Sequence, residues 1–237
     1  MKIAAWSGPR NLSTAMLYAF GSRADCAAWD EPFYAPYLAH TGADHPMTAD
    51  IQHSHETDPS AIAQACAGAV PQGRAHWYMK HMPHHMLPGF DMSWAEQAVN
   101  IHLIRHPARV IASYAAKRDS LTLEDIGFAQ QATVYDRLEG PVIDSETIRA
   151  NPRAALQTLC AEIGLPWDDA MLKWPVGPKP FDGVWAAHWY GAVHRSTGFA
   201  EAEGPLPTVA AQHRAILDAA LPFYEAMKAR AITVTAP

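Results

Sequence analysis

A short apolar segment, a glycine-containing polar loop and an apolar helix pattern follow one another at the start of the chain. Residues 3–6 are apolar and end at a Gly-Pro pair, which predicts a buried strand, and residues 12–20 carry apolar side chains at helical spacing. In a parallel sheet, the loop after such a strand lies at the carboxyl edge, where free amides of the next helix face a ligand. This unit therefore predicts an anion site.

Strand and helix patterns alternate along the rest of the sequence, which predicts an α/β fold with a mostly parallel central sheet. With 237 residues and 49% apolar content, the chain can bury one sizeable core, so we expect one domain over residues 1–237. Residues 41–59, rich in His, Asp, Thr and Pro, predict a loop. The further expected strands are 26–29, 75–80, 99–104 and 142–143, and the further helices are 60–70, 107–117, 123–138, 152–163 and a region after 209 that Pro222 kinks or divides.

Charge and cysteine content narrow the classes of partner. The net charge is −6, so we expect neither nucleic acid nor an anionic membrane as a partner. Cys26, Cys66 and Cys160 are widely spaced and form no CxxC pair, which favours a reducing cytoplasmic location without a disulfide framework or thiolate zinc site. The first apolar run is too short for a signal peptide or membrane span. The oligomeric state stays open.

The loop itself carries groups that suit a terminal phosphate or sulfate. Gly8 allows close backbone approach, Arg10 supplies a positive charge, and Ser13 and Thr14 offer hydroxyls beside the free amides of the first helical turn. The alternative is an ordinary strand-to-helix turn with a surface arginine and a capping serine. The full loop reads Ser7-Gly8-Pro9-Arg10-Asn11-Leu12-Ser13-Thr14.

The loop departs from the Walker pattern of ATP- and GTP-hydrolysing proteins. Four residues separate Gly8 from the Ser13-Thr14 pair, and no lysine precedes that pair, which disfavours NTP hydrolysis. A P-loop nucleotide kinase or NTPase stays open as an alternative, as does a non-catalytic nucleotide-binding protein. The cluster of His81, His84 and His85 also leaves a histidine metal-binding protein open, although its spacing is not that of a known zinc motif.

Two segments resemble P-loop sulfotransferases. Residues 9–14 resemble the family's 5′-phosphosulfate loop, usually Pro, Lys or Arg, Ser, Gly, Thr or Ser, Thr. Residues 102–114 resemble the strand and helix that hold the 3′-phosphate, with Arg105 and Ser113 at the family's arginine and serine positions. The motif order covers residues 1–118. If both matches hold, the Arg10 and Arg105 turns should face one cavity.

The resemblance implies a P-loop-type three-layer domain and a specific reaction. The expected activity is sulfuryl transfer from 3′-phosphoadenosine 5′-phosphosulfate (PAPS) to a hydroxyl or amine of a small-molecule acceptor, with no metal required. The nucleotide-binding residues implied by it are Gly8, Pro9, Arg10, Asn11, Leu12, Ser13, Thr14, Arg105, Ser113 and Arg195, the last in a segment only loosely similar to the family's C-terminal glycine-containing loop.

A third segment, residues 78–83, resembles the family's strand that ends in lysine, another residue, histidine, leucine and proline. His81 takes the place of the family's catalytic base, and Lys80 lies one residue from its lysine. An imidazole can accept the acceptor's proton, although one of 13 histidines is as readily a core side chain. Glu31 is a second candidate base because it ends a strand at the same sheet edge. Arg10 completes the expected catalytic set by stabilising the leaving phosphate.

Overall fold

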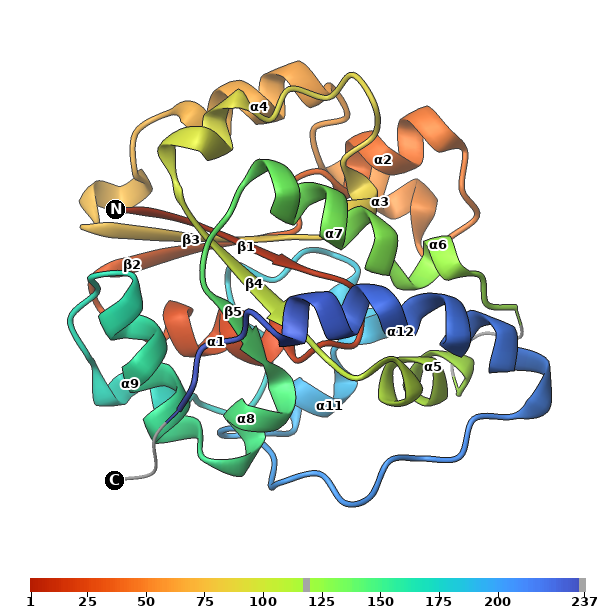
Figure 1. Cartoon of the computed structure of the whole chain (residues 1–237). Coiled ribbons are helices and arrows are strands. Elements are labelled where there is room, and N and C mark those ends of the chain that lie inside the picture. Colours follow the sequence, from red (N-terminus) through yellow and green to blue (C-terminus); the bar gives the residue numbers. More distant parts are fainter. Residues whose placement is uncertain (117–119, 235–237) are drawn as a thin grey trace.

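A parallel sheet forms the centre of the computed structural model, which describes residues 1–116 and 120–234 (Figure 1). Within these residues, five strands lie in the order β2-β3-β1-β4-β5, and every pairing is parallel. This arrangement confirms the predicted α/β class with a parallel sheet. The strands are β1 (Lys2–Ser7), β2 (Cys26–Asp30), β3 (His76–His81), β4 (Val99–Ile104) and β5 (Val142–Asp144).

Helices cover both faces of the sheet. Figure 1 shows α4 and α7 on one side of the strands and α1 and α9 on the other. The helices are α1 (Ser13–Gly21), α2 (Tyr34–Thr41), α3 (Thr48–Ser54), α4 (Pro59–Ala67), α5 (Pro107–Ala115), α6 (Leu123–Ile126), α7 (Phe128–Arg137), α8 (Ser145–Ala150), α9 (Pro152–Glu162), α10 (Ala186–Trp189), α11 (Gly191–His194) and α12 (Arg214–Lys228).

Several details differ from the expected elements. The helix expected over 123–138 is divided into α6 and α7 at Gly127, whose φ of 68° interrupts it, and the helix expected over 60–70 ends at Ala67. The segment predicted as a loop over 41–59 contains α3, whose Ile51 is fully buried and supplies the packing that the local sequence pattern does not show. Helix α12 runs through Pro222 as one element and packs on α5 and α7, so the proline does not divide it. The helix expected over 107–117 ends at Ala115, and Lys117 lies outside the described residues.

The central strand alternates its side chains between the two layers. Ile3 and Ala5 belong to the core that includes α1 and α9, whereas Ala4 and Trp6 pack in the core that includes α4 and α7. Because a strand has a period of two residues and both faces are covered, residues 3–6 of β1 are all apolar. The same alternation applies to β3, where Tyr78 lies in the first core.

The loop between β1 and α1 is held in a tight conformation. Arg10 and Leu12 have φ values of 64° and 71°, a left-handed region that costs free energy for residues with a side chain. Gln131 of α7 stabilises the loop because its Oε1 accepts a hydrogen bond from Gly8 N at 2.8 Å. The same side chain donates from Nε2 to the carbonyl of Trp6 at 2.9 Å. Helix α7 thus fixes the end of β1 and the start of the loop together.

We expect Gly8→Ala to lower the free energy of unfolding by about 1–3 kcal/mol, because a Cβ would lie 2.6 Å from the carbonyl oxygen of Ile126. Urea denaturation measures this loss. Gly204→Ala is the matched control because nothing lies within 4 Å of the added carbon. Equal losses in the two variants would contradict the steric account.

Candidate functional site

A cavity of about 310 Å³ opens at the carboxyl edge of the sheet. Residues from four separate strand ends meet there: the β1 loop, Glu31 after β2, Lys80 at the end of β3 and Arg105 after β4. The turns of Arg10 and Arg105 therefore face one cavity, as the sequence motifs predicted. From the loop, the cavity is lined by Pro9, Arg10, Leu12, Ser13 and Thr14.

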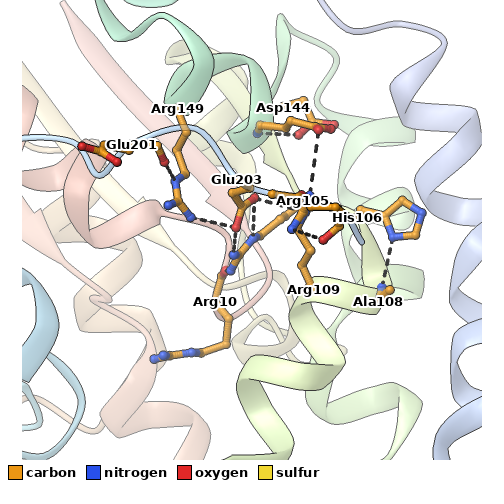
Figure 2. Close-up of polar contacts among 12 residues, drawn as sticks. Arg10, Arg105, His106, Ala108, Arg109, Asp144, Arg149, Glu201 and Glu203 are labelled. Carbon is orange, nitrogen blue, oxygen red and sulfur yellow. Dashed lines mark hydrogen bonds and ion pairs between the residues drawn. The ribbon is translucent and has the colours of Figure 1, made fainter. Parts of the chain in front are cut away.

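The two arginine turns are in direct contact. The guanidinium of Arg105 donates from Nη1 to the carbonyl of Arg10 at 2.7 Å. Arg10 in turn donates from Nε to Ser113 Oγ of α5 at 2.9 Å, so three of the predicted nucleotide-binding residues form one chain of hydrogen bonds. Figure 2 shows the Arg10 and Arg105 side chains in this region.

The electrostatics of this end of the cavity favour an anion. Burial lowers the pKa of Arg10, and the nearby charge of Arg105 lowers it further. Among the described residues, no carboxylate forms an ion pair with Arg10. A half-buried cation without a counter-charge is unfavourable, and an anionic group in the cavity would reduce that cost.

Two of the predicted loop residues, Gly8 and Asn11, bond to the neighbouring elements α7 and β4. The amide of Gly8 is directed to Gln131 and not to the cavity. The buried Asn11 donates from its side chain to the carbonyl of Leu103 at 3.4 Å, which ties the loop to the end of β4. Neither residue lines the cavity. Gly8 and Asn11 therefore stabilise the conformation of the loop.

Lys80 lies at the centre of a buried charge cluster at the other end of the cavity. Its Nζ donates to Asp30 Oδ1 at 2.9 Å, to Glu31 Oε1 at 2.5 Å and to the Tyr190 hydroxyl at 2.6 Å. Tyr190 also donates to Asp30 Oδ2 at 2.7 Å. Only 1% of the Lys80 side chain is exposed, so these three partners replace its water. The sequence motifs identified neither Asp30 nor Tyr190 as part of the site.

The cluster raises the pKa of both Lys80 and Glu31. Burial acts to lower the pKa of Lys80, but the charges of Asp30 and Glu31 outweigh it and raise the pKa. Burial raises the pKa of Glu31, the positive charge of Lys80 opposes this rise, and Asp30 adds to it. Lys80 therefore stays protonated, and Glu31 becomes a stronger base than an exposed carboxylate.

The structure places His81 away from the cavity. Its ring stacks on Trp6, with ring centroids 4.7 Å apart, and also packs on Trp94 at 4.8 Å. Burial lowers the pKa of His81 to about 3. Because successive side chains of β3 point to opposite faces, Lys80 reaches the cavity and His81 enters the core on the other face. This geometry corrects the expectation that His81 is positioned as the base.

Three other histidines, His45, His84 and His85, do line the cavity. His85 stacks on Tyr34 with ring centroids 4.6 Å apart, and its Nδ1 is 3.9 Å from Glu31 Oε2. Burial lowers the pKa of His85 well below its usual value and that of His84 to about 4. Both rings are therefore neutral at pH 7. The sequence contained this histidine pair, but only the structure places it beside Glu31.

Arg195 is exposed at the end of α11 and does not line the cavity, whereas the nearby Ser196 and Gly198 do. Its expected contact with the nucleotide stays a prediction from the sequence. Within residues 1–116 and 120–234, no group of three or more His, Cys, Asp or Glu side chains is arranged to hold a metal ion. No helix in that same part of the chain is both long and apolar enough to cross a membrane.

Comparison with known proteins identifies the family. The sulfotransferase domain family matches residues 1–231, and the chain therefore belongs to it. Two Arabidopsis thaliana proteins named branched-chain-amino-acid aminotransferase-like proteins 1 and 2 are each 31% identical over 231 residues. The match covers 95% of this chain but 41% of each plant protein, so the chain spans less than half the length of these relatives.

A solved structure shares the fold. The sulfotransferase domain of the Synechococcus PCC 7002 olefin synthase superposes with a TM-score of 0.52 at 17% identity, covering 92% of this chain and 94% of that one. This likeness supports the P-loop-type α/β architecture. The family match thus places the chain among sulfotransferase domains, and the superposition shows a shared fold.

Burial of neutral histidines predicts acid sensitivity. The pKa values of His81 and His102 are lowered from 6.5 to about 3 and about 4, so the unfolded chain binds more protons than the folded chain below pH 6.5. The free energy of unfolding should therefore fall as the pH drops from 6.5 toward 4, by about 1.4 kcal/mol per pH unit for each such histidine. Urea denaturation at several pH values measures this slope. His81→Phe should reduce the slope, and an unchanged slope would contradict this account.

Proposed function

We propose that this chain transfers the sulfuryl group of PAPS to a hydroxyl or amine of a small-molecule acceptor. The observation that carries the proposal is the cavity that the Arg10 and Arg105 turns share. The two turns contact each other, and within the described residues no carboxylate pairs with Arg10. A nucleotide with phosphate groups at both ends of its ribose matches two neighbouring cationic anchors.

The loop residues suit the 5′ end of the donor. Ser13 and Thr14 line the cavity at the first turn of α1, where free amides and the helix dipole favour a phosphate. Arg10 would stabilise the charge that grows on the leaving phosphate as the acceptor attacks sulfur in line and the bond from sulfur to that phosphate breaks. Arg105 and Ser113 would bind the 3′-phosphate at the start of α5.

Glu31 is the base that the geometry favours. It lines the cavity, its pKa is raised by burial, and Lys80 holds one of its oxygens in place. A carboxylate so placed can take the proton of the acceptor during attack. Lys80 acts as the positioning partner of Glu31. His81 has no path to an acceptor because its ring lies in the core on the opposite face of the sheet.

The remaining cavity wall suits an acceptor with an apolar part. Tyr34, Met82 and Trp189 line the cavity together with His84 and His85. Aromatic and sulfur-containing side chains supply apolar contact, and the neutral imidazoles supply hydrogen-bonding groups that orient a hydroxyl or amine.

The cytoplasmic location and the single domain over residues 1–237 stay predictions from the sequence.

Arg10→Ala should weaken the binding of adenosine 3′,5′-bisphosphate about tenfold or more, because a charge-assisted contact to phosphate is lost. Isothermal titration calorimetry measures the affinity, and a parallel titration with ATP plus magnesium provides the comparison ligand. Arg153→Ala is the control because this arginine is exposed and pairs with Asp169 on the surface. Wild-type protein that binds ATP but not the bisphosphate would favour the nucleotide kinase or NTPase alternative.

Glu31→Gln should lower kcat about 10²- to 10⁴-fold while adenosine 3′,5′-bisphosphate binds as before, because the base is lost and the phosphate anchors are intact. Asp30 still neutralises Lys80 in this variant. Sulfuryl transfer from PAPS to a panel of hydroxyl and amine acceptors provides the measurement. His81→Phe is the matched comparison and should keep its turnover. The reverse result would restore His81 as the base.

A further inference from the structure

Three arginines surround one glutamate beside the cavity. Arg105, Arg109 of α5 and Arg149 of α8 all lie against the carboxylate of Glu203 (Figure 2). Arg149 Nη1 is 2.7 Å from Glu203 Oε1 and Arg109 Nε is 3.4 Å from Oε2, while Arg105 donates to both oxygens. Only 5% of the Glu203 side chain is exposed. This cluster was not identified from the sequence.

The single carboxylate of Glu203 balances neither the charge nor all the hydrogen-bond donors of the three arginines. Three guanidiniums meet one buried carboxylate, and the only other acidic partner that the described residues provide is Glu146, half-exposed and 4.0 Å from Arg109. Arg109 is nine-tenths buried, yet its Nε has no hydrogen-bond partner of good geometry in the described part of the chain. Such an unmet buried donor is unfavourable. An anion with more oxygens and more charge than a carboxylate would fill this site better.

The position of the cluster matches a phosphate of the donor. Arg105 lines the cavity and contacts the Arg10 loop, so it joins the cluster to the site proposed above. Arg109 and Ser113 are four residues apart on α5 and therefore lie on the same face of that helix. A phosphate bound by Arg105 would thus lie within reach of Arg109.

Hydrogen bonds and ion pairs from these arginines hold the segment that carries Glu203, residues 199–208. Residues 199–208 make no backbone–backbone hydrogen bond with the described part of the chain. Arg109 donates to the carbonyl of Gly204 at 2.5 Å, and Arg149 donates from Nε to the carbonyl of Glu201 at 2.8 Å. The segment is anchored at its ends by the packing of Phe199 on Trp174 and by the buried Val209. Between these anchors the same arginines that would bind an anion hold the segment.

We propose that Arg105, Arg109 and Arg149 form the binding site for the 3′-phosphate of the donor, and that Glu203 occupies this site in the free enzyme. This inference rests on the proposed function. A nucleotide with a 3′-phosphate displaces the carboxylate and takes over its arginine contacts, whereas a nucleotide without one leaves Glu203 in place. Glu203 is then a specificity-determining residue, because displacing it lowers the apparent affinity for any group that binds the arginines weakly.

The test compares two probes, adenosine 3′,5′-bisphosphate and adenosine 5′-monophosphate, by calorimetry on the full chain. Glu203→Gln removes the competing charge and keeps the side-chain shape. We expect it to bind the bisphosphate about tenfold more tightly than the wild type does, and the monophosphate equally. Glu201→Gln is the matched control, since Glu201 is exposed on the same segment, its carboxylate is turned away from the arginines in Figure 2, and both affinities should stay within about twofold of wild type.

Arg149→Ala is a second test, and it does not require the Glu203 variant to fold. It should weaken the bisphosphate about tenfold and leave the monophosphate unchanged, because only the 3′-phosphate contacts Arg149. An unchanged ratio of the two affinities in both variants, with nucleotide bound, overturns the role of Glu203 and leaves the proposed function standing. Failure of wild-type protein to bind either nucleotide overturns the proposed function and this inference together.

Discussion

The contact between the Arg10 loop and the Arg105 turn is the constraint on which the site depends. Two strand-to-helix turns that bear like charges repel each other, and here they are held together by a hydrogen bond from Arg105 to the Arg10 backbone. The sheet makes this possible because β1 and β4 are adjacent parallel strands that end at the same edge. The side chain of Gln131 adds the clamp that keeps the β1 loop in its strained conformation. The fold thus brings two arginines together at one edge of the sheet in a chain whose net charge is −6.

At the opposite end of the cavity the chain uses negative charge in the same way. Asp30 and Glu31 meet Lys80 away from water, so the three groups and Tyr190 depend on one another for their hydrogen bonds. Removing Lys80 would leave the buried carboxylates of Asp30 and Glu31 without their counter-charge, which is far costlier than losing a surface ion pair. The cavity lining therefore combines the Arg10 and Arg105 cations with the paired charges of Lys80 and Glu31.

The sequence predicted the backbone of this site better than its side-chain partners. The loop after β1 and the Arg105 turn carry local patterns, and parallel strands bring such turns together at one edge. Which of Lys80 and His81 faces the cavity depends on the phase of β3, and an apolar strand buried on both faces does not reveal its phase in its own residues. Tyr190 is 160 residues from Asp30, and Glu203 is 98 residues from Arg105, so no local spacing could indicate those contacts.

The pairing of β3 with its neighbours has a consequence for how this family of sequences can vary. In the present register Lys80 lies opposite Ala5 of β1 and Asp30 of β2, which sets the ammonium beside its carboxylates. Insertion or deletion of one residue in β3 ahead of Lys80 would turn the Lys80 side chain to the opposite face, among tryptophans, and a deletion would also direct the His81 imidazole at the acidic pair. Length changes are therefore tolerated in the loops that flank β3 and not in the strand, so alignments of related chains should anchor on this strand.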